Sequence, residues 1–131
     1  MKVFVDTSIF FKWLYGFKKY WRLDFVKKMQ QKYNFIISGY VINEILDNKH
    51  KLWKNLTDKD IFSILKRIFE KYKIQHFLWE LVPENSDFFD YVNDPKDTQI
   101  LYDAISAGSD ILLTDNLKDF KIAEIQQKFN Y

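Results

Sequence analysis

Short apolar runs alternate with amphipathic helical segments along this chain, and that alternation constrains its fold more than any other feature. Strands are predicted at residues 2–6, 34–38 and 110–114, with another somewhere within 74–82. Helices are predicted between and after them, at residues 8–15, 18–33, 39–48, about 57–72, 95–107 and 117–127. Strands separated by helices favour a parallel, doubly wound sheet. We therefore expect an α/β protein with three layers, α/β/α, and a central parallel sheet of four to five strands.

Length and composition are consistent with one domain over residues 1–131. The chain has no cysteine, which excludes disulfides and thiolate metal sites and favours a reducing, cytoplasmic location. No run of apolar residues approaches 18, so no membrane-spanning segment is expected. Asp6 and Lys12 interrupt the first apolar run, which argues against a signal peptide.

Acidic and hydroxyl side chains follow two of the predicted strands. Asp6 comes directly after the first strand, and Thr7 or Ser8 is expected to cap the next helix. The strand at 110–114 ends in Thr114-Asp115-Asn116. Ligands of open α/β sheets bind outside the carboxyl ends of the strands, so the two ends predict a site at one sheet edge.

Two further acids lie on predicted helices. Glu44 lies at the shoulder of the apolar stripe of the helix at 39–48. Asp97 falls in the first turn of the helix that begins at Pro95, with Asp94 as its cap. Asp103 is about 120° around that helix from Asp97, and we expect it to be a solvated surface charge.

The ordered set of these motifs resembles the PIN-domain nucleases, particularly the VapC-like ribonuclease toxins of type II toxin–antitoxin systems. The matching residues are Val5-Asp6-Thr7-Ser8, the helix with Glu44, Asp97 upstream of Ala104-Ile105-Ser106-Ala107-Gly108, and Leu113-Thr114-Asp115-Asn116-Leu117-Lys118-Asp119-Phe120. They cover essentially the whole domain. Relatives often carry one further strand at the end, which is expected to be short or missing here because only four residues remain after 127.

The resemblance implies a site for Mg²⁺ or Mn²⁺, which are hard cations that prefer oxygen ligands. In that scheme Asp6 and Asp97 are the main ligands, Glu44 orients the attacking water, and Asp115 completes the cage. The ion would turn a bound water into the nucleophile. Secondary candidates, which would bind the substrate phosphate or support the acids, are Thr7, Ser8, Thr114, Asn116 and Asp119.

The fourth acid departs from the family pattern. Many relatives place an Asp or Asn two residues after the Thr, whereas here Asp115 follows Thr114 directly and Asn116 comes next. Asp115 is the preferred fourth ligand. The alternative is that Asn116 lines the site and Asp119 assists from the next turn.

The resemblance implies a divalent-metal-dependent endoribonuclease that cleaves single-stranded RNA, acts as a homodimer and is silenced by an antitoxin protein. Two alternatives stay open: a non-toxin ribonuclease of RNA processing or decay, and a degenerate domain that binds RNA or protein without cleavage. A haloacid dehalogenase-type phosphatase is disfavoured, because that chemistry needs an Asp where Ser8 stands.

Charge is divided unevenly along the chain. Residues 1–77 carry 16 Lys/Arg against 7 Asp/Glu, whereas residues 78–131 carry 4 against 11. The basic part interleaves cations with aromatic residues, a composition that suits a nucleic-acid backbone with bases stacked on rings. The aromatic residues of segment 10–21 exceed what two short helices can bury, so the antitoxin is expected to place apolar anchors on some of them: Phe10, Phe11, Trp13, Tyr15, Phe17, Tyr20 and Trp21.

Overall fold

A computed structural model describes the whole chain, residues 1–131. Its strands are β1 (Lys2–Val5), β2 (Asn34–Ser38), β3 (Gln75–Phe77) and β4 (Ile111–Leu113). Its α-helices are α1 (Thr7–Tyr20), α2 (Asp24–Met29), α3 (Gly39–Asp47), α4 (Asp58–Tyr72), α5 (Pro95–Ser106) and α6 (Ile122–Phe129). Three short 3₁₀ helices complete the set: η1 (Lys49–Lys51), η2 (Asp87–Tyr91) and η3 (Leu117–Asp119).

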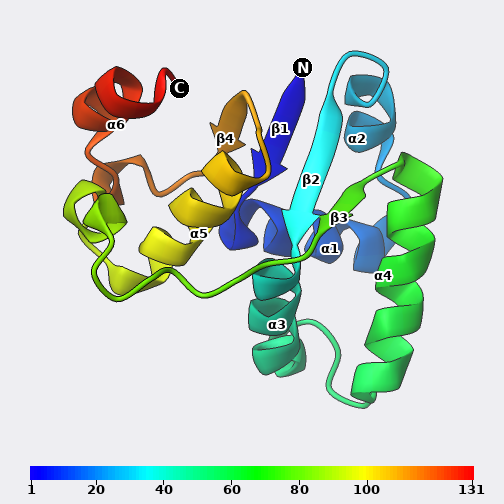
Figure 1. The fold of residues 1–131 in the computed structure, drawn as a ribbon. Coiled ribbons are helices and arrows are strands. Elements are labelled where there is room, and N and C mark those ends of the chain that lie inside the picture. Colours follow the sequence, from blue (N-terminus) through cyan, green and yellow to red (C-terminus); the bar gives the residue numbers. More distant parts are fainter.

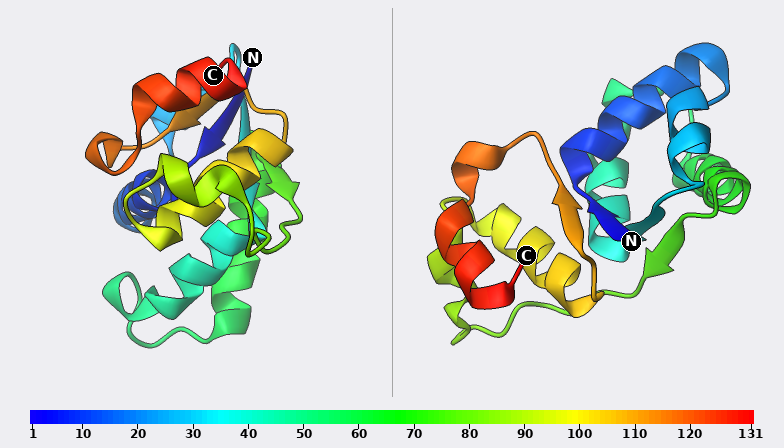
Figure 2. Two further views of the ribbon diagram at one scale, coloured as in Figure 1. Left: turned by 60° about the vertical axis from the view of Figure 1, so that its left-hand side comes forward. Right: turned by 90° about the horizontal axis from the view of Figure 1, so that it is seen from above.

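The four strands form one all-parallel sheet in the order β3-β2-β1-β4. Helices α1, α2 and α4 lie on one side of it, and α5 and α6 lie on the other (Figures 1 and 2). The predicted α/β architecture with a central parallel sheet is thereby confirmed, with four strands. No helix has the length and apolar character needed to cross a membrane.

The two central strands are buried on both faces, as expected when helices cover a parallel sheet on each side. Val3 to Val5 of β1 and Phe35 to Ile37 of β2 are each at most 5% exposed. Helix α1 packs its apolar stripe against them, and the buried residues of that stripe are Phe10, Leu14 and Phe17. Burial of each such side chain contributes about 1.5–3 kcal/mol.

Several helix boundaries follow the predicted signals. Thr57 and Asp60 form a reciprocal capping box at the start of α4, and Asp94 caps α5 by accepting from the N–H of Lys96. No strand follows α6, so β4 forms one edge of the sheet.

The first helices differ from the prediction. Helix α1 runs unbroken to Tyr20, since Gly16 is tolerated within it, and α2 is only six residues long. The N-cap of α1 is Asp6 itself, whose side chain accepts from the N–H of Thr7, so neither Thr7 nor Ser8 is the cap. Helix α1 therefore begins immediately at the end of β1.

Candidate functional site

Asp6 and Thr114 follow two neighbouring strands at the point where the order of the sheet changes direction. From β1 the chain passes to β2 on one side, whereas β4 pairs with β1 on the other. The Asp6 N–H extends this pairing by donating to the Leu113 carbonyl at 3.0 Å. The crevice at such a switch point is where open α/β sheets bind ligands.

A cavity of about 420 Å³, here called the acid pocket, opens beside these strand ends. Its lining includes four carboxylates from three different parts of the chain and three lysines. The carboxylates are Asp6, Glu44, Asp94 and Asp97, and the cations are Lys12, Lys51 and Lys96. The remaining lining residues are Thr7, Ser8, Phe11, Asn48 and Asn116. Three of the four predicted acids are therefore brought into one cavity.

Hydroxyl side chains hold three acids of this region in place. Thr114 Oγ1 donates to Asp6 Oδ2 at 2.6 Å, and Thr7 Oγ1 donates to Glu44 Oε1 at 2.5 Å. Ser8 Oγ donates to Asp115 Oδ1 at 2.6 Å. Hydrogen bonds to ionised carboxylates are the stronger kind, so these contacts fix the acids before any ligand arrives.

Three acids of the pocket, Asp6, Glu44 and Asp97, have a raised pKa. Asp97 is 8% exposed. Burial first, and then the charge of Asp6, raises the pKa of Asp97 to about 7. Burial also raises the pKa of Asp6 and of Glu44, against the hydrogen bonds that they accept. The negative field extends to Tyr40, whose pKa burial and the nearby carboxylates raise to about 12. A cation bound among these groups would relieve their mutual repulsion.

Asp115 and Asn116 occupy different places. Asn116 lines the acid pocket, and its N–H donates to Thr114 Oγ1 at 3.1 Å. Asp115 is exposed and forms an ion pair with Lys12, with 2.5 Å between Nζ and Oδ2. Lys12 and Ser8 lower the pKa of the Asp115 carboxyl, while its charge raises that of Asp6. Asp119 does not line the pocket, although its charge helps raise the pKa of Asp97.

Asp103 is a polar residue whose role the sequence did not reveal. It was expected to be a solvated surface charge, but the structure buries it completely, because α5 packs against α3 on that side. Gln99 Nε2 donates to Asp103 Oδ1 at 2.7 Å, whereas Oδ2 has no hydrogen-bond partner of regular geometry. Burial raises the pKa of Asp103 to about 6, opposed by hydrogen bonding from Ser38 and Gln99. Asp103 thus links α5 to Ser38, the cap of the helix that carries Glu44.

The acid pocket offers the type of ligand that a hard divalent cation prefers, but it offers few such ligands at any one point. All its strong ligands are carboxylate oxygens, and the side chain of Asp97, a residue only 8% exposed, makes no hydrogen bond within the chain. No three Asp, Glu or His side chains are arranged to hold one ion together, however. Magnesium often uses only one or two carboxylates and keeps several waters, so the residues fit that mode.

A second cavity, of about 290 Å³, lies beside β4 and α6. Its lining is mainly apolar, with Leu101, Ile111, Phe120 and Ile125 among its residues. It contains no cluster of acids or bases, and we do not assign the chemistry to it.

Comparison with known proteins finds no matching family model, no matching curated protein and no matching solved structure. Any functional conclusion therefore rests on the geometry and charge of the acid pocket.

Proposed function

We propose that this chain is a divalent-metal-dependent endoribonuclease that cleaves single-stranded RNA by hydrolysis and acts as the toxin of a toxin–antitoxin pair. The observation that carries the proposal is the acid pocket itself. Four carboxylates and three lysines line one cavity at the switch point of a parallel sheet. A phosphodiester is the substrate class that needs both a hard cation and basic side chains.

Asp6 and Asp97 would hold the divalent ion, Mg²⁺ or Mn²⁺, since both residues are buried in the same pocket and the charge of Asp6 helps raise the pKa of Asp97. When bound, the ion would offset the negative charge that develops on the phosphate and would lower the pKa of a bound water molecule. Thr114 keeps Asp6 oriented through its 2.6 Å hydrogen bond. The sequence-based roles of the two aspartates are retained in this proposal.

Glu44 is proposed to position the attacking water and accept its proton. Burial raises its pKa, which brings a carboxylate nearer to the pH at which a general base works best. Thr7 fixes one Glu44 oxygen, leaving Oε2 without a protein partner. Lys51 and Lys96 make no ion pair within the chain and line the acid pocket, so in this proposal they are the side chains that contact the phosphates of the RNA.

The toxin role includes two partners, a second copy of the chain and an antitoxin protein. An antitoxin would silence the enzyme by placing an Arg or Lys against the carboxylates of the acid pocket, a contact of the strong, charge-assisted kind. Without an antitoxin, the same site would serve a ribonuclease of RNA processing or decay.

Expression in bacterial cells tests this proposal. The wild-type chain, Asp6→Asn and the control Asp90→Asn would be induced side by side, with growth and RNA integrity recorded. Asp90 is exposed on η2 and has no ion pair. We expect growth arrest and RNA fragments with wild type and Asp90→Asn but not with Asp6→Asn. RNA cleavage without growth arrest would favour the non-toxin ribonuclease, and intact RNA in all three strains would favour a non-catalytic domain.

A further inference from the structure

Four aromatic side chains lie exposed along the second half of α1 and the start of α2. Tyr15 is 53% exposed, Tyr20 61%, and Trp21 and Phe25 62% each. Phe10 and Phe17, which the sequence had suggested for a partner surface, belong to the core instead. The exposed rings are therefore the part of this aromatic segment that the fold itself does not use.

The end of α1 turns Trp21 outward. Trp21 adopts a left-handed conformation, with φ 57°, and its N–H donates to the Phe17 carbonyl at 2.6 Å to close the helix. One edge of its ring rests on Phe17, at 5.6 Å between centroids. Most of the indole nevertheless remains open to solvent.

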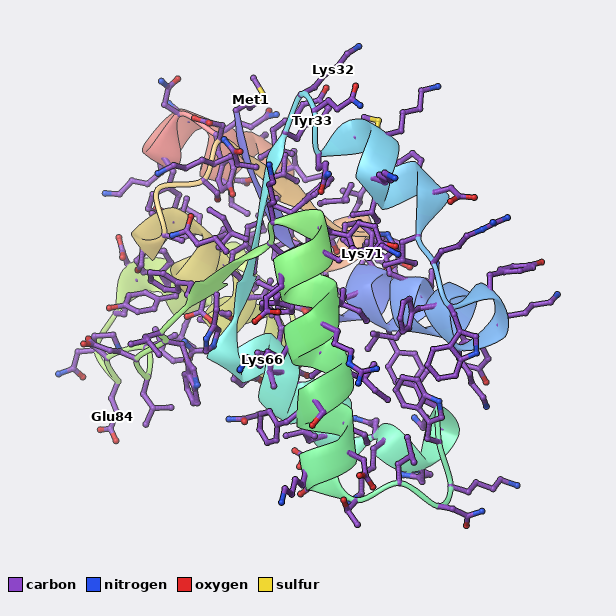
Figure 3. The ribbon with its side chains drawn as sticks, turned by 90° about the vertical axis from the view of Figure 1, so that its right-hand side faces the viewer. Met1, Lys32, Tyr33, Lys66, Lys71 and Glu84 are labelled. Carbon is purple, nitrogen blue, oxygen red and sulfur yellow. The ribbon has the colours of Figure 1, made fainter.

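Cations surround these rings. Residues 15–32 contain six Lys/Arg and one acid, Asp24. Only Arg22 is paired, with Asp24 at 3.2 Å, whereas Lys18, Lys19, Lys27 and Lys28 make no ion pair. The surface thus joins exposed rings to uncompensated positive charge. Figure 3 shows Lys32, Lys66 and Lys71 on the same side of the molecule, over the turn before β2 and along α4.

Helix α1 connects this surface to the acid pocket. Phe11 and Lys12 line the pocket, and Tyr15 and Lys19 follow on the same helix face at spacings of three or four residues. The rings of Phe11 and Tyr15 are in contact, at 6.0 Å between centroids. Fourteen residues of helix span about 21 Å. A cavity of about 310 Å³ opens beyond, lined by Tyr20, Arg22 and Phe25 among others.

We infer that the exposed side chains of the second half of α1 and the start of α2, named here the α1–α2 track, bind single-stranded RNA outside the acid pocket. Bases stack on Tyr15, Tyr20 and Trp21, and phosphates lie against the lysines between them. Rings alternating with cations suit a single strand, since every base has a face to stack and every linkage a negative charge. A helical protein partner would instead need a continuous apolar groove, which the lysines interrupt.

The track goes beyond the proposed cleavage, because binding is measurable when no cleavage occurs. The probe is a fluorescein-labelled oligouridine of about 12 nucleotides, within the range of known single-strand sites. An abasic oligomer of the same length and charge is the second probe. Anisotropy in excess EDTA would compare the full-length wild type with Trp21→Ala, Tyr15→Ala and the control Phe89→Ala. Phe89 is an exposed ring on η2, away from the basic half.

We expect Trp21→Ala and Tyr15→Ala each to weaken oligouridine binding roughly tenfold, because each removes a ring on which a base stacks. Binding of the abasic oligomer should not change, and Phe89→Ala should bind as wild type. Trp21 is the C-cap of α1, so Trp21→Ala could fail to fold. Tyr15 lies within the helix and does not cap it, so Tyr15→Ala still tests the proposal in that case.

If the variants lost affinity equally for oligouridine and for the abasic oligomer, base stacking on the α1–α2 track would be contradicted. Wild-type affinity for oligouridine in both variants would contradict it as well. A wild-type dimer in light scattering that becomes a monomer in Trp21→Ala would assign the surface to a second copy instead. Metal-dependent RNA cleavage by the wild type would survive either failure, so the two proposals fail separately.

Discussion

Thr114, at the end of β4, donates its hydroxyl to Oδ2 of Asp6, at the end of β1, across 2.6 Å and 108 positions of sequence. This contact exists because β4 pairs with β1 in register, Leu113 beside Val5. It gives the predicted acid a fixed orientation before any ligand is bound. Thr7 does the same for Glu44. The hydroxyls that follow the strands therefore hold carboxylates of the acid pocket.

Replacing Thr114 by Val tests this support. Val has nearly the same shape but no hydroxyl, so Asp6 loses one of the hydrogen bonds that lower its pKa. The N–H of Asn116 loses its acceptor as well. We expect a loss of about 1–2 kcal/mol in the free energy of unfolding, measured in urea, and roughly tenfold slower RNA cleavage.

Thr98→Val is the matched control for that change. Thr98 is 1% exposed, and its hydroxyl has no hydrogen-bond partner. Removal of an unsatisfied buried hydroxyl should leave stability unchanged or raise it. Equal destabilisation by Thr98→Val and Thr114→Val would mean that the Thr114–Asp6 contact has no special role.

Asp97→Asn should stabilise the metal-free protein at pH 8. Wild-type Asp97 must ionise in a buried site beside Asp6, which raises its pKa to about 7, whereas Asn carries no charge. Because each unit between the ordinary pKa of 3.8 and about 7 corresponds to roughly 1.4 kcal/mol, we expect a gain of at most about 4 kcal/mol and a Tm higher by several degrees. Added Mn²⁺ should then raise the Tm of wild type but not that of the variant. The measurement is thermal unfolding in EDTA and in Mn²⁺; a Tm of wild type that Mn²⁺ leaves unchanged would contradict the metal site.

Alanine replacement at Asp115 and Asn116 decides between the two candidates for the fourth position. Asn116 lines the acid pocket, whereas Asp115 is paired with Lys12 and Ser8. On this geometry Asn116→Ala should weaken Mn²⁺ binding and cleavage more than Asp115→Ala. The opposite order in a manganese titration would return the role to Asp115, as the sequence first suggested.

The strand-end acids and the parallel sheet were predictable because they depend on local patterns. Asp6 and Thr114 each come directly after a short apolar run, and such a run followed by a polar residue indicates the end of a buried strand. The burial of Asp103 was not predictable in this way. Its angle from Asp97 was estimated from helix geometry, but which neighbour covers that face depends on how α5 meets α3. Likewise, the choice between Asp115 and Asn116 depends on backbone geometry after β4, which no periodicity encodes.

Asp103→Asn should change how stability depends on pH. In the folded protein the pKa of Asp103 is about 6, above its ordinary value of 3.8. The unfolded chain therefore ionises first, and wild-type stability falls as pH rises from about 4 to 6. Asn has no such penalty and can still accept from Gln99. Urea unfolding at several pH values should show the variant gaining on the order of 2–3 kcal/mol over wild type between pH 4 and pH 7. A difference that stays constant with pH would contradict the raised pKa.

Cleavage of a 5′-labelled single-stranded RNA by the purified chain tests the central claim most directly. Wild type, Asp97→Asn and the exposed control Asp90→Asn would be incubated with Mn²⁺ or with excess EDTA, and the product ends would be analysed. We predict cleavage by wild type and Asp90→Asn in Mn²⁺ only, with 5′-phosphate and 3′-hydroxyl ends, and a loss of several orders of magnitude for a folded Asp97→Asn. Full cleavage in EDTA, or by Asp97→Asn, would contradict a metal-dependent nuclease centred on the acid pocket.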